Sequence, residues 1–140
     1  MITNDHYYRA LNIMDRIEDI RINKNIQRTQ FGSYLGFTKA YYYAFYNSCR
    51  TIKTSSLINF AKILNVSVEY LLTGKNLTKY QDFKLDFNKI INCKAKKLPN
   101  SLKVIKCKLK KGVTKDINIK TLFEFEKYYN IPAIKLMGGE

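Results

Sequence analysis

The chain has 140 residues, of which 46% are hydrophobic, and its 25 basic and 11 acidic residues give a formal net charge of +14. This length suffices for one ordinary domain or two small ones with a buried core. No run approaches the roughly 18 apolar residues of a membrane span, and the first residues lack a signal-peptide pattern, so we expect a cytoplasmic protein with no membrane partner. The charge favours a nucleic-acid partner, although lysine richness is also expected from an AT-rich genome.

The cysteines and the histidine supply little material for chemistry. Cys49, Cys93 and Cys107 are an odd number without CxxC spacing, and His6 is the only histidine. Neither a disulfide framework nor a metal site is indicated. Nucleophile elbows, phosphate-binding loops and paired acids at helical spacing are also missing from the sequence, so we expect a protein that is not an enzyme and has no cofactor.

Apolar residues recur at helical spacing along the chain, which predicts an all-α fold. The spacing predicts a first helix over residues 4–22 and a short second helix over about residues 25–35. Gly36 suits the left-handed conformation that ends a helix, so a sharp turn is expected there. Thr38 is the expected N-cap of a third helix, which reaches about Asn47.

Two more helices complete the first unit, which we assign to residues 1–75. Ser55 or Ser56 is the expected N-cap of the fourth helix, which ends at Asn65. Ser67 is the expected N-cap of the fifth, and Gly74 ends it.

A polar linker over residues 76–82 precedes a second, smaller unit over residues 83–140. Its apolar spacing predicts a helix over about residues 83–97 and a turn at residues 99–100. A further helix, with Leu102, Ile105 and Leu109 on its inner face, is expected to end at Gly112.

An internal similarity relates the two units at an offset of 65 residues. The segment IKTSSLINFAKILNVSVEYLLTG reappears, diverged, as INIKTLFEFEKYYNIPAIKLMGG. We interpret this as a duplication whose second copy lacks a full first helix. The matching pairs are Ile52 and Ile117, Leu57 and Leu122, Phe60 and Phe125, Lys62 and Lys127, Asn65 and Asn130, Leu71 and Leu136, and Gly74 and Gly139.

The segments FGSYLGFT, KAYYYAFYN and LINFAKILNVSVEYLLTG, taken in this order, resemble the Cro/lambda-repressor-like (XRE-type) helix-turn-helix family. The resemblance covers about residues 10–75. It implies a lambda-repressor-like five-helix domain, here followed by a degenerate helix-turn-helix-like unit. It also implies a sequence-specific, repressor-like regulator of transcription that binds double-stranded DNA, as a homodimer or with its two units as an internal pseudo-dimer.

The resemblance also assigns roles around a recognition helix at about residues 38–47, which would enter the major groove. Residues expected to face base edges are Lys39, Ala40, Tyr43 and Ala44. Residues expected near phosphates are Arg28, Thr38, Tyr41, Asn47 and Lys53. Tyr42 and Phe45 are expected to point inward.

The third helix departs from the family in being rich in aromatic residues where the family is mostly polar. An alternative is therefore that the fold serves as a protein-interaction adaptor or antitoxin-like module, with the tyrosines of this helix docking a partner.

The second unit is the more basic of the two. Residues 1–75 contain ten basic and five acidic residues, whereas residues 76–140 contain fifteen and six. Lys103, Lys106 and Lys110 recur opposite the apolar stripe of their helix, which predicts a continuous cationic face that contacts phosphates. A solvated face in a lysine-rich protein is the alternative.

Overall fold

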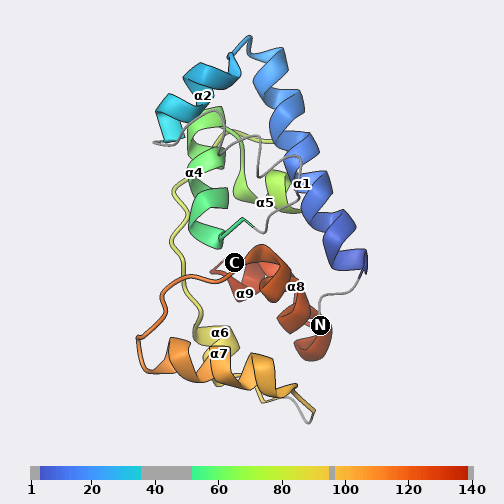
Figure 1. Ribbon diagram of the computed structural model, residues 1–140, viewed down its shortest axis with the longest axis vertical. Coiled ribbons are helices and arrows are strands. Elements are labelled where there is room, and N and C mark those ends of the chain that lie inside the picture. The colour runs from blue at the N-terminus through green and yellow to red at the C-terminus, as the bar shows by residue number, and fades with distance from the viewer. Residues whose placement is uncertain (1–3, 36–51, 95–96, 139–140) are drawn as a thin grey trace.

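The computed structural model describes residues 4–35, 52–94 and 97–138, which form helices joined by short turns and extended segments (Figure 1). The predicted all-α class is confirmed for these ranges. Their eight helices are α1 (Asn4–Asn23), α2 (Arg28–Leu35), α4 (Thr54–Leu64), α5 (Val68–Thr73), α6 (Asn88–Asn92), α7 (Asn100–Lys110), α8 (Ile119–Tyr129) and α9 (Ala133–Leu136).

The helix ends near residues 65–74 follow from local sequence as predicted. Ser67 Oγ accepts a hydrogen bond from Tyr70 N at 3.1 Å and so caps α5, and Gly74 ends that helix with a left-handed φ of 79°. The predicted cap of the preceding helix is wrong, because α4 begins at Thr54 and its N-cap is Lys53. Ser55 lies inside the first turn, where its hydroxyl donates to the carboxylate of Asp116.

The predicted helix over residues 83–97 is also wrong, because only α6 forms within the described part of that range. Residues 75–87 form neither a helix nor a strand. Asp86 N donates to Met137 O at 3.0 Å, and a Cβ on Gly138 would lie 2.4 Å from Lys84 O. The end of α9 therefore packs directly against this segment, and the contact with its backbone replaces the helix.

The two segments of the predicted repeat fold alike. α4 and α8 have the same length and begin 65 residues apart. α5 and α9 also begin 65 residues apart. Asn65 and Asn130 end α4 and α8 with the same left-handed φ of 55°. The matched core side chains are fully buried in both copies: Leu57 with Leu122, Phe60 with Phe125, and Leu71 with Leu136.

An antiparallel bridge between Lys53 and Asn118 joins the two copies. Two backbone hydrogen bonds flank it: Thr54 N donates to Ile117 O at 3.0 Å, and Ile119 N donates to Ile52 O at 2.8 Å. The two donors are 65 residues apart, and so are the two acceptors. Each hydrogen bond is therefore the counterpart of the other when the two copies of the repeat are interchanged. A local two-fold axis therefore passes between Lys53 and Asn118.

One cluster of buried hydrophobic side chains runs through all the described helices. The long helix α1 lies along α4 and α5 and extends to α8 (Figure 1). There the Arg9 guanidinium lies 3.7 Å from the centre of the Phe123 ring, and its Nη1 is 2.5 Å from Glu126 Oε1. The other oxygen of Glu126 accepts from Ala133 N at 2.8 Å. The first helix thus packs against both copies.

None of the described helices combines the length and the apolar character needed to cross a membrane.

Candidate nucleic-acid interface

Helix α7 carries four lysines, Lys103, Lys106, Lys108 and Lys110. Pro99 precedes the helix as its N-cap, and Gly112 follows it with a left-handed φ of 74°, as the sequence predicts. Leu102 and Leu109 are buried on the inner face, and Ile105 is half-buried between them. This apolar stripe fixes the rotation of α7 on the core, so the opposite side of the helix faces solvent.

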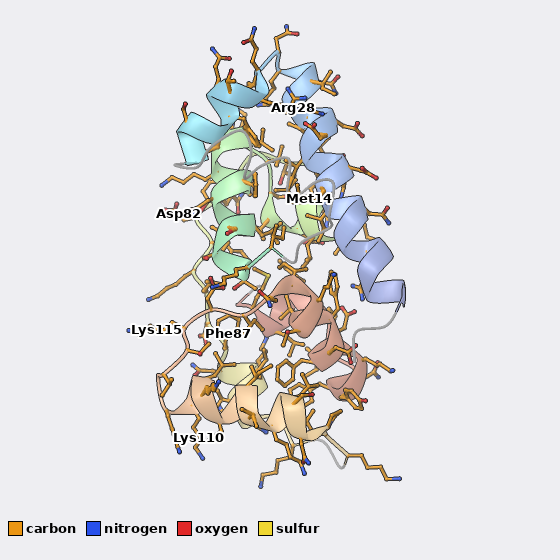
Figure 2. All side chains as sticks on the ribbon, in the orientation of Figure 1. Met14, Arg28, Asp82, Phe87, Lys110 and Lys115 are labelled. Atoms are coloured by element: carbon orange, nitrogen blue, oxygen red, sulfur yellow. The ribbon has the colours of Figure 1, made fainter. Side chains whose placement is uncertain are left out.

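The exposed side carries what we call the lysine surface. Its members are exposed lysines of α7 and of the loop that follows: Lys103, Lys108, Lys110, Lys111 and Lys115. Figure 2 shows Lys110 and Lys115 pointing away from the body of the molecule. Lys103 and Lys110 are seven residues apart on one flank of α7, which is about 10 Å along the axis. The lysine surface is thus a broad region of positive charge formed by α7, whose inner face packs on the core, and by the loop that follows it.

Lys106 does not belong to this surface, and the predicted continuous face through Lys103, Lys106 and Lys110 is corrected here. Lys106 is half-buried, and its Nζ donates to Cys93 O at 2.6 Å, next to the C-terminal end of α6. The same Nζ lies 5.8 Å from the centre of the Tyr129 ring. An ammonium group near the C-terminal end of a helix is favoured by the helix dipole. Lys106 therefore has a structural role at the end of α6.

Tyr129 packs beneath the same end of α6. Its hydroxyl donates to Ile90 O at 3.0 Å, and burial, followed by the neighbouring Cys93 thiol, raises the pKa of Tyr129 to about 12. The phenol therefore keeps its proton, and can donate this hydrogen bond, at alkaline pH values where an ordinary tyrosine ionises.

The acidic residue Asp116, next to the lysine surface in sequence, is directed inward. Its Oδ1 accepts from Ser55 N at 3.2 Å and from Ile117 N at 2.9 Å, and the hydroxyls of Thr54 and Ser55 also donate to its carboxylate. Asp116 thereby binds the first turn of α4 across the two-fold axis, where free backbone amides favour an anion. The negative charge of Asp116 therefore stabilises the start of α4 and is not directed at the lysine surface.

The lysine surface is not neutralised by neighbouring acids in the described part of the chain. Ion pairs of the described residues include that of Arg9 with Glu126 and those of Arg21 and Arg28 with Glu18. No lysine of the lysine surface takes part in an ion pair within those ranges. Such a surface attracts polyanions, because binding releases the counterions that they carry.

Arg28, predicted to lie near phosphates, is held by α1. Its Nε and Nη2 donate to Glu18 Oε1 at 2.9 and 2.7 Å, and Glu18 is buried. Arg21 donates to the other oxygen of Glu18, and its Nη1 donates to Ile26 O at 2.6 Å. The network fixes the turn between α1 and α2, and the charge of Arg28 is balanced by Glu18.

A further arginine is structural. Arg16 donates from Nε to Leu71 O and from Nη2 to Leu72 O, each at 3.0 Å, and so satisfies carbonyls at the end of α5. Burial lowers the pKa of Arg16, against opposing effects of Tyr70 and Asp15.

Lys53, the other predicted phosphate contact of the first unit within the described residues, lies beside the two-fold axis. Its side chain is exposed, and it lines a shallow pocket of about 200 Å³ together with Lys108, Asn118 and Thr121. The pocket brings Lys53 of the first unit close to the lysine surface of the second. The structure thus connects two predicted phosphate-contacting regions that the sequence places far apart.

The predicted recognition helix lies outside the described residues. This applies to the positions expected to contact DNA there: Thr38, Lys39, Ala40, Tyr41, Tyr43, Ala44 and Asn47. Their roles stay predictions from the family resemblance.

The contacts between the units that have no counterpart in the sequence predictions include the bridge between Lys53 and Asn118, the Asp116 cap on α4 and the pairing of Arg9 with Glu126. Asp116 did carry a signal, since it is the only acid among the ten lysines from Lys94 to Lys120. Arg9 carried none.

The chain matches no protein family, no curated protein and no solved structure in the three comparisons made. Its described residues also contain no group of three or more histidine, cysteine or acidic side chains arranged to bind a metal ion.

Proposed function

We propose that this chain is a regulator of transcription that binds duplex DNA, in which residues 38–47 read base edges in the major groove and the second unit contacts phosphates. The observation that carries the proposal is the lysine surface on α7. Five exposed lysines lie on a helix and loop whose neighbouring acid, Asp116, is directed into the fold. Lysine is a point charge and suits contacts to the phosphate backbone more than bidentate recognition of a base.

The first unit supports the other half of the proposal. The segment that carries the family resemblance forms α4 and α5, with the Ser67 cap and the left-handed Gly74 at the expected places. In the family these helices support a recognition helix. Lys39 and Tyr43 provide hydrogen-bonding groups, and Ala40 suits a thymine methyl group.

Selection from a random duplex library at near-physiological salt tests the proposal. We expect an enriched sequence motif, and an affinity for the selected duplex that falls steeply with salt because several phosphate contacts release counterions. Lys39→Ala and Tyr43→Ala should lower the affinity for the selected duplex more than for a scrambled one.

Two results would contradict the proposal. One is a library from which no motif is enriched, combined with an affinity that does not respond to salt. The other is a pair of variants, Tyr41→Ala and Tyr43→Ala, that abolish binding of a protein partner without affecting DNA affinity, which would favour the adaptor alternative.

A further inference from the structure

An open groove of about 430 Å³ lies between the segment that precedes α6 and the loop that follows α7, and both can be followed in Figure 1. Its floor is apolar and has no part in the phosphate contacts proposed above. Four side chains form this floor, of which Phe87 and Leu109 are buried and Leu85 and Ile91 are half-buried. Sites for small molecules in proteins have volumes of about 300–1,000 Å³ and mostly apolar walls. The groove therefore has the size and the lining of such a site.

Both walls of the groove are held by hydrogen bonds to neighbouring helices. On one side, Asp86 N donates to Met137 O at 3.0 Å, at the C-terminal end of α9. On the other side, Thr114 N donates to Lys108 O at 3.3 Å, in the last turn of α7. The groove is therefore formed before any ligand binds, as is usual for small-molecule sites.

The rim of the groove is positively charged. Lys84 and Lys115 come from opposite walls, and both are exposed (Figure 2 labels Lys115). Within the described ranges neither of these lysines forms an ion pair. An acid, Asp86, also lines the groove, but its Oδ1 accepts a hydrogen bond from Asn88 N at 2.8 Å. An anion that enters the groove thus meets two ammonium groups that can each donate a charge-assisted hydrogen bond.

We infer that the groove binds a small amphipathic anion, whose apolar part lies on Phe87 and Ile91 and whose carboxylate lies between Lys84 and Lys115. A medium-chain fatty acid has this chemistry, because one end of the molecule is apolar and the other carries a single negative charge. A small, fully polar anion fits less well, since it would meet the two lysines but leave the apolar floor exposed to water.

Occupation of the groove affects the lysine surface, because Lys115 belongs to both. A bound carboxylate balances the charge of Lys115, so the lysine surface attracts phosphates less strongly. The anion is thus an inhibitory effector of DNA binding, and this role, unlike the site itself, rests on the proposed function. The coupling is reciprocal, so a bound duplex should lower the affinity for the anion by the same factor.

Octanoate, octan-1-ol and acetate test the site on the full chain, because they separate the apolar part from the charge. Isothermal titration calorimetry should show saturable binding of octanoate, no saturable binding of acetate, and about fivefold weaker binding of octan-1-ol, since exposed ion pairs contribute modestly. Lys84→Ser/Lys115→Ser should weaken octanoate binding about fivefold and leave that of octan-1-ol unchanged. The control, Lys62→Ser/Lys127→Ser, removes exposed lysines of α4 and α8 and should leave octanoate binding unchanged.

Methyl NMR spectra locate the bound octanoate without any variant. The methyl signals of Leu85 and Ile91 should shift and reach saturation as octanoate is added. Those of Ile63, which is half-buried on α4, should stay in place. Shifts that spread over both units without saturation would overturn the inference, because they would show unspecific adsorption of the fatty acid.

A competition experiment tests the effector role. Saturating octanoate should lower the affinity for the selected duplex about threefold relative to acetate at the same concentration, since screening by salt limits the effect of one charge. Acetate matches the ionic strength and so controls for the salt response of DNA binding. Lys84→Ser/Lys115→Ser should show no difference between the two anions.

The outcomes separate this inference from the proposed function. If octan-1-ol binds as tightly as octanoate, or if the signals of Leu85 and Ile91 do not shift, the inference is overturned even if the chain binds DNA. If octanoate binds in the groove but no duplex is bound, the proposed function fails and the site stands. If both bind and octanoate leaves the duplex affinity unchanged, the effector role is overturned.

Discussion

The two units use their positive charges differently. All four described arginines, which lie in the first unit, donate to acids or carbonyls within the fold: Arg9, Arg16, Arg21 and Arg28. Residues 76–140 contain no arginine, and their lysines are mostly exposed. Arginine has a planar group with five donors and suits fixed internal pairs, whereas lysine is strongly hydrated and stays at the surface. The net charge of a unit therefore says less about its ligand than the type of basic residue.

The two copies of the repeat, by contrast, are nearly equivalent in their cores, and the largest effects should come from testing this equivalence. Phe60→Ala and Phe125→Ala remove rings that are both fully buried. We expect each to lower the free energy of unfolding by about 3–5 kcal/mol, measured by urea titration.

Because one core cluster runs through both units, each of these variants should still unfold in a single transition, with circular dichroism and tyrosine fluorescence coinciding. Val113→Ala, which shortens a side chain that is 72% exposed in the loop after α7, is the control and should alter stability by less than about 0.5 kcal/mol. Separate transitions for the two units would show that the copies are independent.

A second comparison concerns the link between the copies. Asp116 caps α4, but α8 has no side-chain cap from its own N-cap residue Asn118. Asp116→Ala leaves the hydroxyls and the amide of the first turn of α4 without this acceptor and should cost about 1–3 kcal/mol of unfolding free energy. Asp116→Asn keeps one acceptor oxygen and should cost less.

Asp82→Ala, at an exposed position between α5 and α6, is the matched control for Asp116 (Figure 2). Equal stability of the Asp82 and Asp116 variants in thermal unfolding would argue against a cap across the two-fold axis.

The left-handed ends of α4 and α8 provide a finer test. Ala at position 65 or 130 requires a non-glycine, non-asparagine residue to adopt a φ of 55°, so Asn65→Ala and Asn130→Ala should each cost about 1 kcal/mol. The first should cost slightly more, because Asn65 Oδ1 also accepts from Tyr80 N at 3.3 Å. Asn→Gly at either position keeps the conformation accessible and should be close to neutral. A larger loss for Gly than for Ala in urea titrations would contradict this view of the helix ends.

Sequence alone predicted those parts of the fold that depend on neighbouring residues. The Ser67 cap, the Gly74 and Asn65 ends and the inner face of α7 are local features and are confirmed. The predicted start of α4 was wrong because the side chain that caps its first turn belongs to Asp116, 61 residues after Ser55 in the chain. The predicted helix over residues 83–97 was wrong because the backbone of residues 84–86 packs against the end of α9.

The candidate site divides in the same way. Helical spacing placed Lys103 and Lys110 on an exposed flank, which the structure confirms. It did not predict that Lys106 would turn toward Cys93, because the carbonyl it binds belongs to α6. The roles of residues 38–47 remain predictions that the DNA-binding experiments above will decide.

The smallest expected effect concerns a position where the copies differ. Leu64 of α4 corresponds to Tyr129 of α8, whose hydroxyl donates to Ile90 O of α6. Below pH 10, Tyr129→Phe should lose this hydrogen bond and about 1 kcal/mol of unfolding free energy. The pKa of Tyr129 is raised from 10 to about 12, so the folded state keeps the proton in a range where the unfolded state releases it. The stabilisation is therefore present below pH 10 and is lost as the pH rises toward 12.

The stability difference between wild type and Tyr129→Phe, measured by urea titration from pH 8 to pH 12, isolates this contribution from the other tyrosines and lysines that titrate in both proteins. We expect the advantage of the wild type to shrink steadily above pH 10. A difference that stays constant across this range would mean that the phenol ionises equally in the folded and unfolded chains. The hydrogen bond from Tyr129 to Ile90 of α6 would then contribute no measurable stability beyond what Leu64 contributes at the matched position of the first copy.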